Sequence, residues 1–181
     1  MFIQTETTPN PLTLKFLPGV IVMESGTAFF TNVEDAAISP MAIELFAIEG
    51  VKAIFLGSDF ITVTKDEASS WDELKAPLLT SIMDFLVAKK PVMLSSKKEI
   101  IVNENDSDIV KQIKELIETR VRPAVAQDGG DIIFHDFSDG IVQLELHGSC
   151  SGCPSSTITL KNGIENMLKH YIPEVIAVEA I

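Results

Sequence analysis

The sequence predicts an α+β protein made of two small domains, an N-terminal mixed α+β domain and a C-terminal domain with the order α-β-β-α-β. In both halves, short β-prone runs alternate with stretches whose apolar residues recur at helical spacing. Each half also contains two strand-like runs separated by a short turn of Gly, Ser and Asp residues, which is typical of a β-hairpin. The clear periodicity is lost in between, over a lysine-rich stretch. We therefore expect domains at 1–90 and 106–181, joined by a linker at 91–105.

The first half begins with three short strand-like runs, FIQTE, LTLKF and TAFF. A helical pattern follows, for which Ser39 is the expected N-cap and Pro40 the first helical residue, and which stops at Gly50. Two further runs, VKAIFL and FITVTK, flank Gly57-Ser58-Asp59 and predict a hairpin.

The last element of the first half is an amphipathic helix. Pro77 interrupts its pattern, and we expect a proline to be tolerated there only if it lies near the first turn. The apolar side chains that recur at helical spacing are Leu74, Leu78, Ile82, Phe85 and Leu86.

The second half opens with a helix that Asp106 or Ser107 caps and that Pro123 kinks or ends. Arg120 and Arg122 fall near its C-terminal end, where the helix dipole favours cations. The stretch QDGGD then turns the chain, because Gly129 and Gly130 are free to adopt positive φ. We interpret its carboxylates as turn residues.

A hairpin, a helix and a strand complete the second half. Ser138-Asp139-Gly140 connects IIFHDF to IVQLELH, where Val142, Leu144 and Leu146 alternate with polar residues and should face inward. A helix from Pro154 and a last strand in EVIAVEA follow.

Charge and composition exclude several classes of partner. The net charge is −12, with 14 basic against 26 acidic residues, which disfavours binding to nucleic acid or anionic lipid. No apolar run approaches the roughly 18 residues of a spanning helix, so we expect no membrane segment. The N-terminus has no feature of a signal or transit peptide, and two cysteines are too few for a disulfide scaffold. We therefore expect a cytoplasmic protein.

Both cysteines lie in one short stretch, HGSCSGCPSST, at Cys150 and Cys153. Cys153 directly precedes Pro154 and is the expected N-cap of the helix that follows. A helix N-terminus lowers the pKa of a nearby thiol, so we expect both thiols to be good ligands or nucleophiles. Gly148 and Gly152 leave room for a bulky ligand beside them.

Four interpretations of this pair are open: two unligated thiols, a thiol–disulfide oxidoreductase, a zinc site and an iron–sulfur site. The oxidoreductase motif usually follows the first strand of a βαβ unit, whereas this pair follows an antiparallel hairpin. Zinc and iron–sulfur clusters both prefer four thiolates, and one chain supplies two. Two chains related by a two-fold axis would supply four. His135, His147 and His170 lack ligand spacing to the pair and are not expected to bind metal.

The run RPAVAQDGGDIIF…GIVQLELHGSCSGCPSSTITLKNGIENMLKHYIPEVIAV resembles the Nfu domain, the C-terminal domain of NifU-type iron–sulfur scaffold proteins. The resemblance spans about residues 106–181 and includes DGGD, the CxxC loop and the helix after it, in the family's order. The first half, including TETTPNPLTLKFLPG and Trp71, resembles the N-terminal domain of two-domain Nfu proteins.

This resemblance implies a non-enzymatic scaffold or carrier. It would hold a [4Fe–4S] cluster between two chains, with Cys150 and Cys153 as ligands, and would pass the cluster to apo iron–sulfur proteins. The donor would be the iron–sulfur assembly machinery, and the loaded form a homodimer. The sequence lacks the mitochondrial presequence and the additional cysteine-rich region that some members carry, so we expect either a bacterial cytoplasmic protein or a processed protein of the mitochondrial matrix.

Overall fold

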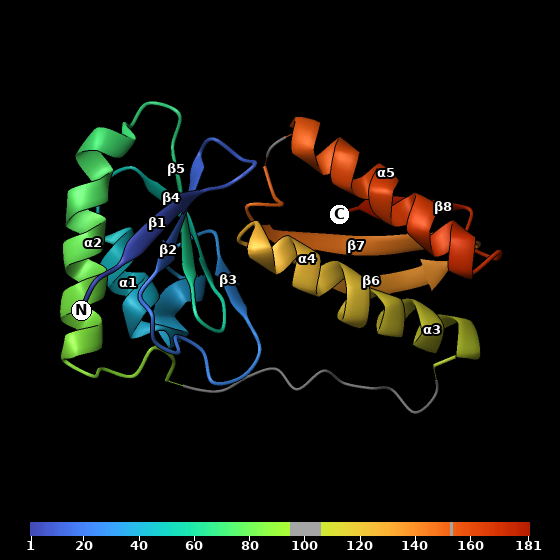
Figure 1. The fold of residues 1–181 in the computed structure, drawn as a ribbon, viewed down its shortest axis with the longest axis horizontal. Coiled ribbons are helices and arrows are strands. Elements are labelled where there is room, and N and C mark those ends of the chain that lie inside the picture. Colours follow the sequence, from blue (N-terminus) through green and yellow to red (C-terminus); the bar gives the residue numbers. More distant parts are fainter. Residues whose placement is uncertain (95–105, 153) are drawn as a thin grey trace. The chain divides into compact units, whose positions relative to one another are not determined.

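The computed structural model of the chain describes residues 1–94, 106–152 and 154–181, with the side chains of 154–156 excepted. The chain divides into two compact units, Met1–Glu99 and Ile100–Ile181 (Figure 1). Each combines a sheet with helices, so the predicted α+β class is confirmed. None of the described helices is long and apolar enough to cross a membrane.

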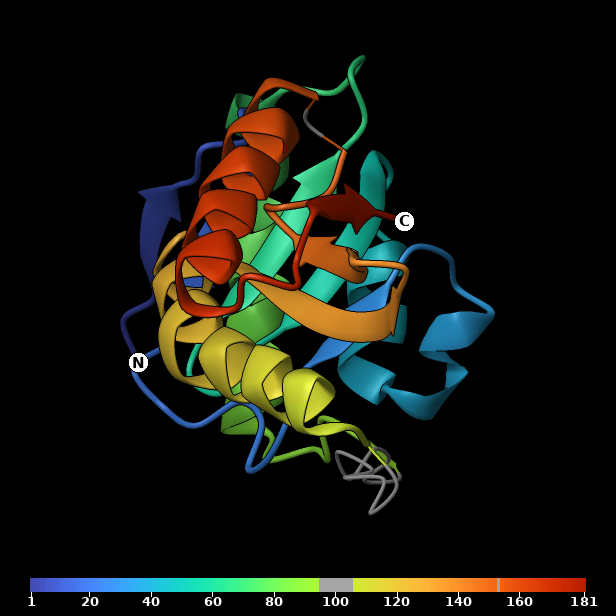
Figure 2. The same cartoon turned by 90° about the vertical axis from the view of Figure 1, so that its right-hand side faces the viewer.

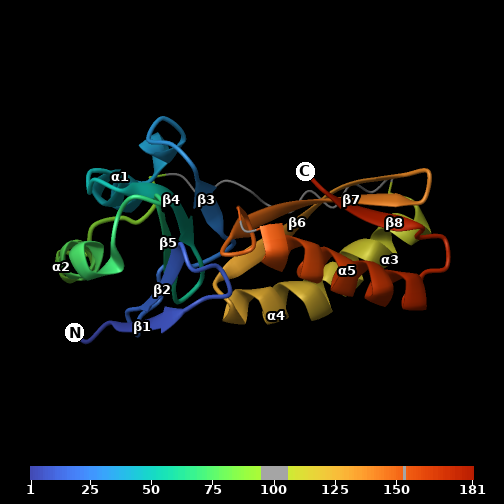
Figure 3. The same cartoon turned by 90° about the horizontal axis from the view of Figure 1, so that it is seen from above.

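The first unit is a five-stranded sheet with two helices against one face, as Figures 1 and 3 show. The strand order is β1-β2-β5-β4-β3, and every neighbouring pair is antiparallel. Phe16, Ile54, Leu78 and Phe85 are among the fully buried side chains that join sheet and helices in one core. The elements are β1 (Gln4–Thr7), β2 (Thr13–Leu17), β3 (Ala28–Phe30), the 3₁₀ helix η1 (Asp35–Ile38), α1 (Pro40–Phe46), β4 (Val51–Leu56), β5 (Ile61–Lys65) and α2 (Trp71–Val87).

The predicted cap and hairpin of the first unit are confirmed. The Ser39 hydroxyl accepts a hydrogen bond from the backbone N–H of Ala42 at 3.2 Å, and Pro40 is the first residue of α1. Strands β4 and β5 pair antiparallel across residues 57–60. At both positions, the residues of the element itself were enough to predict the observed structure.

The expectation for Pro77 is wrong. Ser70 caps α2, so Pro77 is the seventh helical residue and lies beyond the first turn. A proline there removes the hydrogen bond to the carbonyl of Glu73. Both residues are exposed, so water can satisfy that carbonyl and the helix continues.

The first unit extends past α2. The Ser39 hydroxyl donates to the carbonyl of Val92 at 2.7 Å, and the Leu94 N–H donates to the carbonyl of Ile38 at 2.8 Å. The beginning of the predicted linker therefore packs on this unit. The rest of that linker, 95–105, lies outside the described residues.

The second unit is a three-stranded sheet with all its helices against one face (Figures 2 and 3). β6 and β7 form an antiparallel hairpin, and β8 pairs with β7 in parallel. Ile113, Ile132, Leu144 and Leu168 are buried in the core between the two layers. The elements are α3 (Asp108–Leu116), the π-helix η2 (Ile117–Val121), α4 (Arg122–Gln127), β6 (Gly130–Ser138), β7 (Ile141–Gly148), α5 (Pro154–Tyr171) and β8 (Ala177–Ala180).

The predicted order of the second unit is confirmed, with one difference in its first helix. Ser107 caps α3 by accepting from the Val110 N–H at 3.3 Å. Pro123 does not end the helix, because a π-helical turn directly precedes α4 and the helical path continues to Gln127. The turn after β6 has positive φ at Asp139 and Gly140, as a tight hairpin requires.

Candidate metal-binding loop

The cysteine loop connects the end of β7 to the start of α5 and is anchored to the loop before β6. The Ser149 hydroxyl donates to the carbonyl of Asp128 at 2.6 Å, and the Ser149 N–H donates to the carbonyl of Gly129 at 3.2 Å. The Thr157 hydroxyl, one turn into α5, donates to the carbonyl of Cys150 at 3.2 Å. The backbone on both sides of Cys150 is therefore held by hydrogen bonds.

Cys150 lies in the core of the second unit, with 6% of its surface exposed. Burial raises the pKa of its thiol to about 12, and the carboxylates of Asp128 and Asp131 act in the same direction. The expectation that a helix N-terminus lowers the pKa of this thiol is therefore wrong. The physical reason is position: Cys150 comes four residues before the first residue of α5 and packs into the interior instead.

A buried neutral thiol is a poor nucleophile, since the thiolate is the reactive form. It can still ligate a metal, because metal binding displaces the thiol proton. The chemistry of the described cysteine thus suits a ligand better than an oxidoreductase nucleophile.

Cys153 lies outside the described residues, so its predicted role as N-cap stays a prediction. Its neighbour Gly152 is exposed and has a φ of +79°, and a Cβ on it would meet no described residue within 4 Å apart from its chain neighbours. The loop is thus open at Gly152, as the sequence predicted. A glycine is favoured at this position because of its positive φ, not because a side chain would be crowded.

Gly130, the second glycine of the DGGD motif, lies against the thiol of Cys150. A Cβ on Gly130 would overlap the sulfur of Cys150 and would lie 2.9 Å from the carbonyl oxygen of His147. Gly129, by contrast, has a φ of +80° and makes the turn itself. The predicted positive φ is thus found at Gly129. Gly130 already lies in β6, and its lack of a side chain leaves room for the Cys150 thiol.

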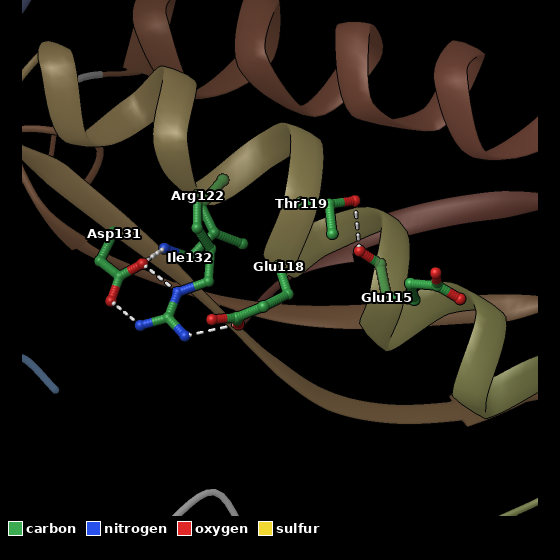
Figure 4. A network of polar contacts seen from close by, with 6 residues as sticks. All are labelled: Glu115, Glu118, Thr119, Arg122, Asp131 and Ile132. Carbon is green, nitrogen blue, oxygen red and sulfur yellow. Dashed lines mark hydrogen bonds and ion pairs between the residues drawn. The ribbon is translucent and has the colours of Figure 1, made fainter.

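Asp131, the last residue of the motif, is part of a buried ion pair (Figure 4). Its side-chain oxygens accept from Nε of Arg122 at 2.8 Å and from Nη2 at 2.7 Å, and Oδ1 also accepts from the Ile132 N–H at 2.8 Å. Nη1 of Arg122 donates to Glu118 at 2.7 Å. Interpreting Asp131 as a turn residue is therefore wrong: it lies in a strand and is 3% exposed.

Arg122 is accordingly not held by the helix dipole alone. Its hydrogen bond to Asp131 is the main reason that its pKa is raised above the ordinary value. The sequence showed both residues but not their contact, which joins α4 to the first residues of β6. An arginine nine residues before a motif aspartate was the only available signal.

Two of the three histidines make side-chain contacts of their own. Nε2 of His147 lies 2.9 Å from Glu145 Oε1, and the ring of His170 packs edge-on against Tyr171. Within residues 1–94, 106–152 and 154–181, no group of three or more His, Cys, Asp or Glu side chains is arranged to hold a metal ion.

Comparison with known proteins places the two units in one family. Residues 3–89 match the model described as scaffold protein Nfu/NifU N terminal, and residues 113–179 match the NifU-like domain. The chain belongs to the Nfu/NifU family. The NFU1 iron-sulfur cluster scaffold homolog of Homo sapiens, a mitochondrial protein, is 52% identical over 183 residues, covering 100% of this chain and 72% of its own length.

Other relatives are similarly close and also mitochondrial. NifU-like protein 4 of Arabidopsis thaliana is 52% identical over 99% of this chain, and the Drosophila willistoni NFU1 homolog is 49% identical over 100%. The chain spans 65% and 64% of the lengths of these two relatives. The expected bacterial cytoplasmic location is wrong on this evidence, because these members of the family are all named as mitochondrial proteins.

Proposed function

We propose that this chain is an iron–sulfur cluster carrier. Two copies would share one [4Fe–4S] cluster through Cys150 and Cys153 of each chain and transfer it to apo iron–sulfur proteins. The cluster is cargo, and the protein performs no turnover chemistry. The donor would be the machinery that assembles clusters.

One observation carries the proposal: both cysteines of the chain lie within four consecutive residues of the sequence, while relatives named as iron–sulfur cluster scaffolds match the chain from end to end. Four thiolates complete the coordination of a cubane cluster, so two chains are needed. The geometry around Cys150 supports this role, because Gly130 makes room for its sulfur and the loop is open at Gly152.

The features of this loop suit release of the cluster. Cluster stability depends on exclusion of solvent and on hydrogen bonds to sulfur. Gly152 is exposed, and among the described residues beyond its chain neighbours none lies within 4 Å of its Cβ position, so a cluster bound here would be shielded incompletely. An acceptor with a more enclosed site would then remove it.

The test is anaerobic reconstitution with iron and sulfide, followed by metal and sulfide analysis and by size-exclusion chromatography with light scattering. We expect a brown dimer with acid-labile sulfide and about two irons per chain, as a shared four-iron cluster requires. A strong iron chelator should return the protein to a monomer, because a ligand bound only by the dimer promotes association by mass action. Mixing the loaded dimer with an apo [4Fe–4S] enzyme should restore that enzyme's activity.

Different outcomes reject different parts of the proposal. Colourless protein with zinc and no sulfide would indicate a zinc-bridged dimer. A CxxC that cycles between dithiol and disulfide without binding iron would indicate a redox protein. A monomer carrying four irons would exclude the shared cluster, whereas a dimer without metal would exclude only metal-driven association.

A further inference from the structure

A second surface of interest lies on the first unit, at the β1 edge of its sheet. Strand β1 is the outermost strand, and in the described part of the chain it pairs with β2 alone. In a strand of this kind, alternate backbone N–H and C=O groups point away from the neighbour and remain available to another chain. β1 is neither bulged against β2 nor interrupted by proline, two devices that commonly protect sheet edges.

An open hollow of about 690 Å³, which we call the β1 hollow, lies beside this edge. Its apolar lining comes from the segment before β1 and from the end of β2 and the loop after it. Phe2 is 79% exposed and Ile21 is 71% exposed, although both are large apolar residues. Exposed apolar side chains that gather in one concave place favour a binding site over an ordinary surface. The apolar residues are Phe2, Leu17, Val20 and Ile21.

The polar part of the β1 hollow is acidic. Gln4 and Glu6 pair with Leu17 and Lys15 in the register of β1 and β2, so their side chains share the face that lines the hollow. Glu6 lies 3.8 Å from the largely buried amino group of Lys15, and Asp59 contributes a second carboxylate. Among the described residues, none that lines the hollow is cationic.

We propose that the β1 hollow binds an extended segment of a partner protein, which adds to β1 as a sixth strand. Backbone hydrogen bonds to the edge would provide affinity, and alternate side chains entering the hollow would provide specificity. The fitting segment carries aliphatic and basic side chains on one face. The aliphatic ones contact Phe2 and Ile21, and the basic ones lie against Glu6 and Asp59.

The same observations disfavour other occupants. The two carboxylates would repel nucleic acid and anionic lipid. Pairing of β1 with its counterpart in a second copy would bring two acidic hollows together, which costs free energy through like-charge repulsion. This surface belongs to the first unit and contains no cysteine, so the inference stands independently of the cluster proposal.

The experiment titrates the ¹⁵N-labelled full chain with a synthetic peptide of sequence Val-Thr-Lys-Thr-Val-Thr-Lys, which presents valine and lysine on one face. We expect saturable shifts of the amide signals of residues 2–7 and 17–21. A peptide with glutamate in place of lysine should bind at least about tenfold more weakly. Of two peptides N-methylated at alternate residues, one should lose binding, because its methyl groups face β1.

Matched variants localise the binding. Two double variants should each lower the affinity for the lysine peptide by about tenfold or more. One is Phe2→Ser with Ile21→Ser, and the other is Glu6→Lys with Asp59→Lys. The control is Val87→Ser, which removes an apolar side chain that is 64% exposed but does not line the hollow. Absence of saturable shifts, equal binding of both N-methylated peptides, or loss of binding only in Val87→Ser would overturn the proposal. Concentration-dependent shifts of residues 2–7 without peptide would indicate a second copy and overturn it as well.

Discussion

Arg122 and Asp131 are joined by two hydrogen bonds of 2.7 and 2.8 Å, and this pair fixes the start of β6 against the preceding helix. The residue next to Asp131 is Gly130, which packs directly against the sulfur of Cys150. The ion pair therefore positions the strand against which the cysteine loop packs, and the Asp131 carboxylate also helps to raise the pKa of the Cys150 thiol.

Replacing Arg122 with methionine should lower the free energy of unfolding of the second unit by about 3 kcal/mol, because the Asp131 carboxylate stays buried without its partner. Arg122→Lys should recover only part of the loss, since lysine cannot make the two-point contact. Urea unfolding measures both effects. Glu118→Gln is the control: this side chain is 54% exposed, and its loss should cost below about 1 kcal/mol. If Arg122→Met were as stable as Glu118→Gln, the claim that the Arg122–Asp131 ion pair stabilises the second unit would be wrong.

Gly130→Ala should displace Cys150 and lower the iron bound after reconstitution. The new methyl group overlaps the sulfur, and the overcrowding should cost about 1–3 kcal/mol of stability. In a Cys150→Ala background the same change should cost less, because the sulfur is gone. Gly163→Ala serves as control: nothing lies within 4 Å of its Cβ position in α5, so it should stabilise the helix by up to about 1 kcal/mol. Equal costs of Gly130→Ala with and without the sulfur would refute the packing argument.

Cys150→Ala and Cys153→Ala should each abolish cluster binding without unfolding either unit. The apolar cores of the two units do not depend on metal for their burial. Elemental analysis after anaerobic reconstitution, together with circular dichroism, provides the measurement. Ser151→Ala, which alters one of the two residues between the cysteines but keeps both thiols, should bind iron normally. Full iron content in either cysteine variant would exclude that residue as a ligand.

The contact between α5 and β8 should weaken in acid. Glu165 accepts from Lys169 at 2.7 Å and from the Val178 N–H at 3.0 Å, and these two bonds lower the pKa of its carboxyl. The stabilisation is therefore present above the pKa of the unfolded chain and is lost as pH falls through the lowered pKa of the folded state. Glu165→Gln should be less stable than the parent at pH 7, and the difference should shrink towards pH 3. Urea unfolding at a series of pH values tests this, and a constant difference would count against it.

Much of the fold was predictable because its signals are local. Ser39 before Pro40 determines where α1 begins, and Asp139-Gly140 supplies the positive φ values of the second hairpin. The alternation of Val142 and Leu144 with polar residues gave the inward face of β7 correctly. At each of these positions, the deciding interaction lies within a few residues of the chain.

The site was less predictable because its interactions join distant residues. The helix after the loop suggested a lowered thiol pKa, but the burial of Cys150 depends on β6, which lies about twenty residues earlier in the sequence. The ion pair of Asp131 likewise requires knowing which face of α4 meets β6. The place of Pro77 was unpredictable for a related reason: whether a helix tolerates a proline depends on whether water can reach the carbonyl that loses its donor.

The π-helical turn at Ile117–Val121 determines where this helical segment can change in length. The buried residues Ile113, Ile117, Val121 and Val125 are spaced four apart, which in a regular helix would rotate each about 40° past the one before it. The wider turn absorbs that rotation and keeps all four on the core. A π-helical turn holds one residue more than an α-helical turn, so deleting one residue there would restore a regular helix and leave the direction of Arg122 almost unchanged. A deletion within α3 or α4, by contrast, would rotate the residues on its two sides by about 100° relative to one another and would misalign the helix with β6, the strand that supports the cysteine loop.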